Sequence, residues 1–433
     1  MPSFHLCAGV IGLSALFSLI NQHTLRLPTT AALLLLSALA GGATLLADRL
    51  LPDLGLRQIV AELVEDANLP RTVLQGALGF LLFAAAYNVD LRALWRRKWT
   101  VLVLATLGVA ASTLLLGLAM HAAFALAGLD LSLAWCLAFG ALVAPTDPVA
   151  VAEVLRRVGL PPGLQATISG ESLFNDGAGV IGFVTLAGVA AAAGAGAAGP
   201  PPLPAEVAFG FLTASVGAAL LGTATGWLAL CAMRSVDEVN LELMISLALV
   251  TITYSLGEVL DLSAPIAVAT AGLLIGHYGP RRAISPGSRG QIETFWSLVD
   301  GLLNALLFLA IGFQLVVIQL TSPILLAATA AIPLALLARA VSVLLPTLAI
   351  PAPLGGRLAG IAILSWGGLR GGVSVALALT LPPGPWRDPL LAACYAVVLF
   401  TVLVQGLTLE RLVRRLQPTI DAATRRHEAA APG

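Results

Sequence analysis

The chain has 433 residues, of which 58% are hydrophobic and 11% are charged, and its formal net charge at pH 7 is zero. Soluble domains carry about 25% charged residues, so this composition excludes an ordinary soluble protein and indicates a polytopic membrane protein. The four cysteines lie within apolar runs and lack the spacing of metal ligands. We expect neither a cofactor nor a nucleic-acid partner.

A transmembrane helix needs about 20 apolar residues. The sequence contains thirteen candidate runs: residues 4–22, 29–47, 70–90, 99–127, 130–156, 165–195, 203–232, 239–261, 264–278, 296–319, 323–350, 357–381 and 388–410. The segments 53–69 and 282–295 mix charged and apolar residues, which is typical of interfacial amphipathic helices. The tail after Gln417 is charged and rich in Ala and Pro, which predicts disorder.

Lys and Arg are concentrated in alternate loops along the chain. The strongest clusters lie in residues 92–98, 281–289 and 411–426. Because basic loops remain in the cytoplasm, this alternation predicts a multi-pass protein of the inner (cytoplasmic) membrane. Its N-terminus would lie outside and its C-terminus inside the cell.

Two of the apolar runs are interrupted near their middle. Pro145 and Pro148 bracket Asp147 in the fifth run, and the glycine-rich stretch 367–372 interrupts the twelfth. Prolines break helices and free backbone groups. The two breaks lie seven runs apart, and an odd offset reverses orientation across the membrane. This predicts an inverted-topology repeat in which two broken helices cross near the midplane.

The acids near the first break are candidates for an ion site, because a charge at that depth costs several kcal/mol. Burial disfavours the charged form of Asp176, and either a proton or a small cation can neutralise that carboxylate. Competition between the two is sufficient for exchange. A hard cation prefers oxygen ligands, and the nearby oxygen donors are Thr146, Asp147, Ser172, Asn175 and Asp176.

Other charges at depth need partners of their own. Glu171 shares a helix face with Asn175, and Arg339 lies in the middle of the eleventh run. We expect Glu171 and Arg339 to form a buried ion pair. The negative charge of Asp147 would be stabilised by the partly positive N-termini of the crossing half-helices, and the positive charge of Arg370 by their partly negative C-termini. A structural role and a transport role both remain open for Arg370.

Four motifs together carry a family resemblance. They are Ala-Pro-Thr-Asp-Pro-Val-Ala (144–150), Gly-Glu-Ser-Leu-Phe-Asn-Asp-Gly (170–177), Ala-Arg-Ala (338–340) and Trp-Gly-Gly-Leu-Arg-Gly-Gly-Val (366–373). In order and spacing they resemble the monovalent cation:proton antiporters of the NhaP/NHE type. The resemblance implies an all-α fold of about thirteen spans, similar to NhaA, that works by alternating access as a homodimer. It also implies that Asp176 is the exchanging carboxylate, with Thr146, Asp147 and Ser172 near the ion and Glu171 paired with Arg339.

The same resemblance implies a division of the chain. Residues 1–98 and 203–319 would form a dimerisation scaffold, residues 99–202 and 323–413 the ion-translocating core, and residues 414–433 a cytoplasmic tail. Many relatives carry a glutamate after Leu-Phe in the third span, whereas Ala84 follows Leu82 and Phe83 here. The choice among Na⁺, K⁺ and Li⁺ therefore stays open.

Exchange of Na⁺ for H⁺ is the function that these residues favour. Asn175 leaves no third free acid beside Asp147 and Asp176, which favours one-for-one coupling. A sodium-coupled symporter for an organic anion would need a roomier polar cavity, and a cation channel would need a ring of carbonyls or acids from symmetric subunits. The sequence has no phosphate-binding loop, zinc motif or serine-nucleophile elbow, so we do not expect an enzyme.

Overall fold

The computed structural model describes residues 2–51, 71–147, 151, 162–194, 204–285, 287–349 and 357–430. In these residues all regular structure is helical. Eight helices of the described chain are long and apolar enough to cross a membrane: Thr29–Leu50, Lys98–Leu126, Leu164–Ala193, Phe209–Met233, Val239–Val259, Arg289–Gln314, Ser322–Thr347 and Arg387–Ile420. The expectation of an all-helical, multi-pass membrane protein is therefore confirmed.

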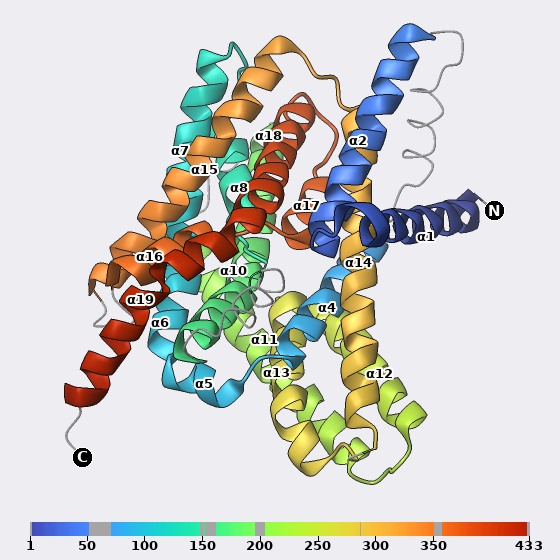
Figure 1. Cartoon of the computed structure of the whole chain (residues 1–433), viewed down its shortest axis with the longest axis vertical. Coiled ribbons are helices and arrows are strands. Elements are labelled where there is room, and N and C mark those ends of the chain that lie inside the picture. Colours follow the sequence, from blue (N-terminus) through green and yellow to red (C-terminus); the bar gives the residue numbers. More distant parts are fainter. Residues whose placement is uncertain are drawn as a thin grey trace.

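The elements follow one another along the chain as labelled in Figure 1. The first half contains α1 (Pro2–Ile20), the π-helical turn η1 (Asn21–Leu25), α2 (Thr29–Leu50), α4 (Arg71–Tyr87), α5 (Leu91–Arg96), α6 (Lys98–Val103), the π-helical turn η3 (Leu104–Gly108), α7 (Val109–Leu126), α8 (Leu133–Val143) and α10 (Pro162–Gly194). The second half contains α11 (Pro204–Met233), α12 (Val239–Val259), α13 (Ala264–Arg282), α14 (Arg289–Val317), α15 (Ser322–Ala349), α16 (Arg357–Trp366), α17 (Gly372–Leu379), α18 (Arg387–Phe400), the π-helical turn η4 (Thr401–Gln405) and α19 (Gly406–Ala430).

The helices pack in two groups (Figure 1). In the first group α2 lies along α14, and α13 contacts α4, α11 and α12. In the second group α8 contacts α7 and α10, and α15 contacts α7 and α18. The groups meet where α10 and α17 of the second touch α4, α13 and α14 of the first. This boundary is where the candidate site lies.

Both predicted interruptions are present. Helix α8 ends at Val143, and residues 144–147 continue without helical structure. Helix α16 ends at Trp366, and α17 begins at Gly372 after a short non-helical stretch. The second half of the first interrupted run lies outside the described residues, apart from Val151. The structure thus places two open helix ends of one broken span beside the open end of another.

Segment 282–295 does not form a separate interfacial helix. Helix α13 ends at Arg282, and α14 runs without interruption from Arg289 into the bundle. Ile292 of this segment belongs to the buried face of α14 together with Trp296 just beyond the segment, because neither has exposed surface. The charged residue between them, Glu293, is exposed. The other predicted interfacial helix, 53–69, lies outside the described residues.

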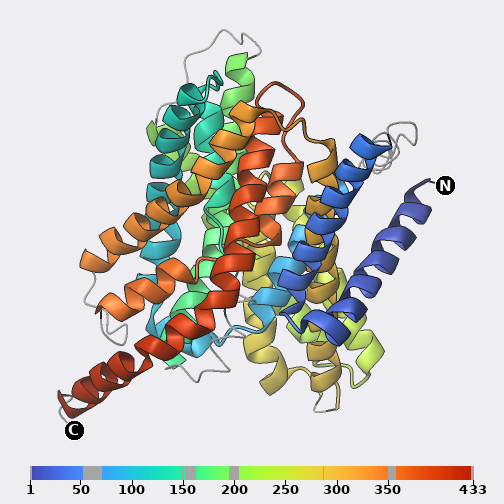
Figure 2. The ribbon, with the colours of Figure 1, turned by 45° about the horizontal axis from the view of Figure 1, so that its top comes forward.

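The prediction of a disordered tail is wrong as far as Ala430. Helix α19 continues α18 and η4 beyond Gln417, as the red end of the chain in Figure 2 shows. Leu409, Val413 and Ile420 of α19 are fully buried in a cluster with residues of α16. These apolar residues recur on one helix face, and packing against α16 stabilises a helix that composition alone argues against.

Small residues let α2 and α14 approach each other closely. A Cβ atom added to Gly41 would overlap the carbonyl oxygen of Gly312. The Ser37 hydroxyl donates a hydrogen bond of 3.0 Å to the carbonyl oxygen of Phe308 across the same contact. Close backbone approach of this kind is how membrane helices gain packing energy without a hydrophobic driving force.

This contact gives a matched pair of variants on one helix. Gly41→Ala should lower the free energy of unfolding by about 1–3 kcal/mol, because the added methyl group overpacks the contact. Gly42→Ala adds the same methyl group where nothing lies within 4 Å. It should be neutral or should gain up to about 1 kcal/mol from helix propensity. Thermal unfolding in detergent measures both, and equal stability of the Gly41→Ala variant and the parent would contradict the contact.

Candidate functional site

Arg370 joins the two broken spans. Its Nη1 donates to the carbonyl oxygens of Ala144 and, at 3.0 Å, of Pro145, which are open at the end of α8. The amide of Asp147 in turn donates to the Leu369 carbonyl oxygen at 2.7 Å. Arg370 is only 2% exposed. A buried cation beside open helix carbonyls satisfies their partial negative charge, as expected at a helix C-terminus.

Asp147 lies at the beginning of α17. Gly371 caps that helix, and a Cβ atom added to Gly371 would lie 2.6 Å from the Cβ atom of Asp147. The absence of a side chain at Gly371 therefore lets Asp147 approach the open end of α17. The N-terminus of a helix carries partial positive charge, so this position favours the ionised carboxylate.

Glu171 and Arg339 form a two-pronged ion pair. Nη1 and Nη2 of Arg339 each donate to one Glu171 carboxylate oxygen at 2.8 Å. Asn175 adds a hydrogen bond of 2.9 Å from its Nδ2 to Glu171 Oε1. Glu171 is 1% exposed and Arg339 is 7% exposed. The parallel hydrogen bonds and the charges together stabilise a pair that would be costly if either partner were missing.

Thr146, Ser172 and Asn175 are joined in the same network. The Thr146 and Ser172 hydroxyl oxygens lie 2.9 Å apart, and Asn175 Nδ2 donates to the Thr146 hydroxyl at 2.8 Å. Asn175 Oδ1 accepts a hydrogen bond from the Thr146 amide at 3.2 Å. Both the oxygen and the nitrogen of the Asn175 side-chain amide are thus hydrogen-bonded. These bonds hold the unwound chain at Thr146 against α10.

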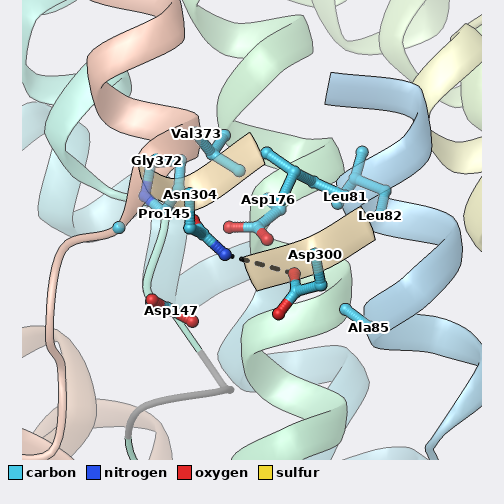
Figure 3. A pocket seen from close by; sticks show the side chains of 11 residues that line it. Leu81, Leu82, Ala85, Pro145, Asp147, Asp176, Asp300, Asn304, Gly372 and Val373 are labelled. Carbon is cyan, nitrogen blue, oxygen red and sulfur yellow. Dashed lines mark hydrogen bonds between the residues drawn. The ribbon is translucent and has the colours of Figure 1, made fainter. Parts of the chain in front are cut away.

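Beside this network lies a small cavity at the boundary of the two helix groups (Figure 3). It is lined by Leu81, Leu82, Ala85, Pro145, Asp147, Asp176, Asp300, Asn304, Gly371, Gly372 and Val373. Of the five residues expected to surround a cation, Asp147 and Asp176 line this cavity. The other three lie behind it in the hydrogen-bond network.

Asp176 is the acid of the cavity that has least access to solvent. It is 4% exposed, and no hydrogen-bond donor or ion-pair partner reaches it among the described residues. Figure 3 shows its carboxylate directed into the cavity from α10. Glu171, five residues earlier on α10, is paired with Arg339, whereas Asp176 has no cationic partner among the described residues. A buried carboxylate in this position needs a proton or a cation from solution.

Asp300 and Asn304 were not expected at this site. They lie on α14, and Asn304 Nδ2 donates to Asp300 Oδ1 at 3.2 Å. The premise that no third acid accompanies Asp147 and Asp176 is therefore wrong. A signal was present in the sequence, since Asp300 is an acid inside the apolar run 296–319, as Asp147 is in its own run. Helix α4 contributes only apolar side chains, and Ala84 is buried away from the cavity.

The buried ion pair predicts a large loss of stability when either partner is removed. Glu171→Ala and Arg339→Ala should each cost about 3–5 kcal/mol, because each leaves a buried charge uncompensated. A charge swap of the two residues should recover part of the loss. Thermal unfolding midpoints in detergent provide the measurement.

The exposed pair Glu410–Arg414, with an N···O distance of 2.7 Å on α19, is a matched control. Glu410→Ala should change stability by no more than about 0.5 kcal/mol, because solvent screens the pair. If Glu171→Ala and Arg339→Ala unfold at the temperature of the parent, the stabilising role of the buried pair is refuted.

Comparison with known proteins places this architecture among membrane transporters. Residues 12–415 match the family described as "Sodium/hydrogen exchanger, transmembrane". The chain is 38% identical over 422 residues to the Na⁺/H⁺ antiporter NhaP of Pseudomonas aeruginosa, covering 95% of this chain and 96% of that protein. It is 34% identical to the Na⁺/H⁺ antiporter NhaH of Halobacillus dabanensis, over 80% of this chain and 83% of that one.

A solved structure shares the fold. The sodium proton antiporter MjNhaP1 from Methanocaldococcus jannaschii superimposes with a TM-score of 0.75 at 21% identity, covering 96% of this chain and 99% of that chain. The family match spans both broken helices, the ion pair and the cavity. The chain belongs to the sodium/hydrogen exchanger family of membrane transporters.

Proposed function

We propose that this protein exchanges Na⁺ for H⁺ across the cytoplasmic membrane. The observation that carries the proposal is Asp176, a buried carboxylate without a protein partner that opens into a cavity at the crossing of two broken helices. The similar proteins NhaP and NhaH are Na⁺/H⁺ antiporters, which supports the same activity. No family match supports an organic-anion symporter or a cation channel. The proposal invokes no cofactor.

In this mechanism Asp176 binds either a proton or a cation. Asp147 adds a second carboxylate to the cavity, and the helix end at Gly371 favours its charged form. Thr146, Ser172 and Asn175 act by positioning the unwound chain, so that the Asp147 carboxylate and the backbone near it face the ion. Arg370 keeps the crossing intact while the site is empty. Whether K⁺ or Li⁺ replaces Na⁺ depends on cavity size and oxygen number.

Alternating access would come from relative movement of the two helix groups. We assign residues 99–202 and 323–413 to a moving core and residues 1–98 and 203–319 to a scaffold that also forms a homodimer. The cavity lies between α10 and α17 of the proposed core and α4 and α14 of the proposed scaffold, which supports this division. Thirteen spans in an NhaA-like inverted repeat, with the N-terminus outside and residues 414–433 in the cytoplasm, complete the proposal.

The exchange should stop when Asp176 loses its charge. Asp176→Asn keeps the shape of the side chain but cannot exchange a proton for a cation, so we expect no cation-driven proton movement. Everted vesicles with a fluorescent pH indicator measure this movement. Glu293→Gln is the control, because Glu293 is an exposed carboxylate of α14 outside the cavity. Clear pH-dependent antiport by purified Asp176→Asn protein in proteoliposomes would refute the assignment.

The coupling ratio is proposed to be one cation for one proton. Glu171 is held ionised by Arg339, so Asp176 is the acid that changes its proton. The third acid, Asp300, must keep its protonation state through the cycle for this ratio to hold.

A membrane potential then acts on no net charge, although 100 mV would contribute about 2.3 kcal/mol per charge moved. We therefore expect cation efflux from proteoliposomes to be the same with and without a potential imposed by valinomycin. A rate or a final gradient that changes strongly with voltage would show electrogenic exchange, with Asp300 as the first candidate for the additional proton.

A further inference from the structure

The three acids of the cavity differ in their access to solvent. Asp176 is 4% exposed, whereas Asp147 and Asp300 are each partly exposed. In Figure 3 Asp300 of α14 lies across the cavity from Asp147 of the unwound chain, and Asp176 comes from α10. The cavity therefore has an inner part at Asp176 and a more accessible part between Asp147 and Asp300.

Asn304 and Asp300 present oriented oxygen atoms to the accessible part of the cavity. Its Nδ2 donates to Asp300 at 3.2 Å and so fixes the orientation of both side chains. Its Oδ1 then receives no hydrogen bond among the described residues, although Asn304 is only 6% exposed and lines the cavity. A carbonyl oxygen at a cavity wall without a protein donor is free to meet a cation or a water molecule.

A single ion cannot use all three acids at once. In the described chain no group of three acidic side chains is arranged to hold one metal ion. Asp147 lines the same cavity as Asp176 and Asp300, and Figure 3 shows it below Asp176 and across from Asp300. The acids therefore form two overlapping pairs that share Asp147.

We propose that Asp300, Asn304 and Asp147 form an outer station for the transported monovalent cation, from which the ion passes to the inner pair of Asp147 and Asp176. The outer station supplies two carboxylates and one neutral oxygen, which suits a small hard cation. The role of the outer station in transport rests on the proposed function. Cation binding at the outer station does not require Asp176, so an experiment can test this binding separately from exchange.

The test measures Na⁺ binding to purified full-length protein that cannot exchange. Thermal unfolding of Asp176→Asn is followed in NaCl and in choline chloride of equal ionic strength at alkaline pH. We expect Na⁺ to raise the unfolding temperature of Asp176→Asn and of Asp176→Asn/Glu293→Gln, because both keep the outer station. We expect no rise for Asp176→Asn/Asp300→Asn. An equal rise in all three variants, or none in Asp176→Asn, overturns the proposal.

Transport by the single variants provides a second test if the double variant does not fold. Asp300→Asn should raise the apparent KM for Na⁺ by about tenfold and change the maximal rate by less than about twofold, because the inner pair is intact. Asp300→Glu should recover most of the affinity, and Glu293→Gln should match the parent. An unchanged KM in Asp300→Asn overturns the proposal. If the parent shows no exchange but the Na⁺-dependent rise still requires Asp300, the proposed function fails and the outer station stands.

Discussion

The site depends on the hydrogen bonds that Arg370 makes across the crossing of the two broken spans. A helix that stops inside an apolar phase leaves backbone groups without partners, and each such group costs several kcal/mol. The Arg370 guanidinium meets the open carbonyls of Ala144 and Pro145, and the Asp147 amide meets the Leu369 carbonyl. Because these contacts hold the unwound segments in place, carboxyl groups can face a cavity instead of a helix neighbour.

The second constraint is how the buried charges are distributed between structure and ion binding. Glu171 accepts hydrogen bonds from both Arg339 and Asn175, so both of its carboxylate oxygens have partners. Asp176 lies five residues further along α10, on a different side of the helix, and accepts a hydrogen bond from neither of these residues. The same helix therefore presents a neutralised acid to one side and a bare acid to the cavity. This asymmetry makes one acid structural and leaves the other available to a proton or a cation.

Much of this was determined by local sequence. Runs of apolar residues indicate spans because their length must match the bilayer. Pro145, Pro148 and the glycines around Arg370 predict breaks because they disturb the helix itself. The pairing of Glu171 with Arg339 could be expected from the cost of two charges at depth, and the structure places them 2.8 Å apart. The four motifs are sufficient to indicate the family from the sequence alone.

Only the tertiary structure decided which side chains share the cavity. Asp300 and Asn304 lie more than 120 residues from Asp176, and they reach it because α14 turns that face toward α10 and α17. The rotation of each helix depends on contacts such as Ser37 with Phe308, which hydropathy does not encode. Tertiary contacts also explain why Thr146, Ser172 and Asn175 form hydrogen bonds with one another. Packing against α16 likewise explains why α19 is helical. Sequence determines which residues cost energy when buried, and packing determines which of them meet.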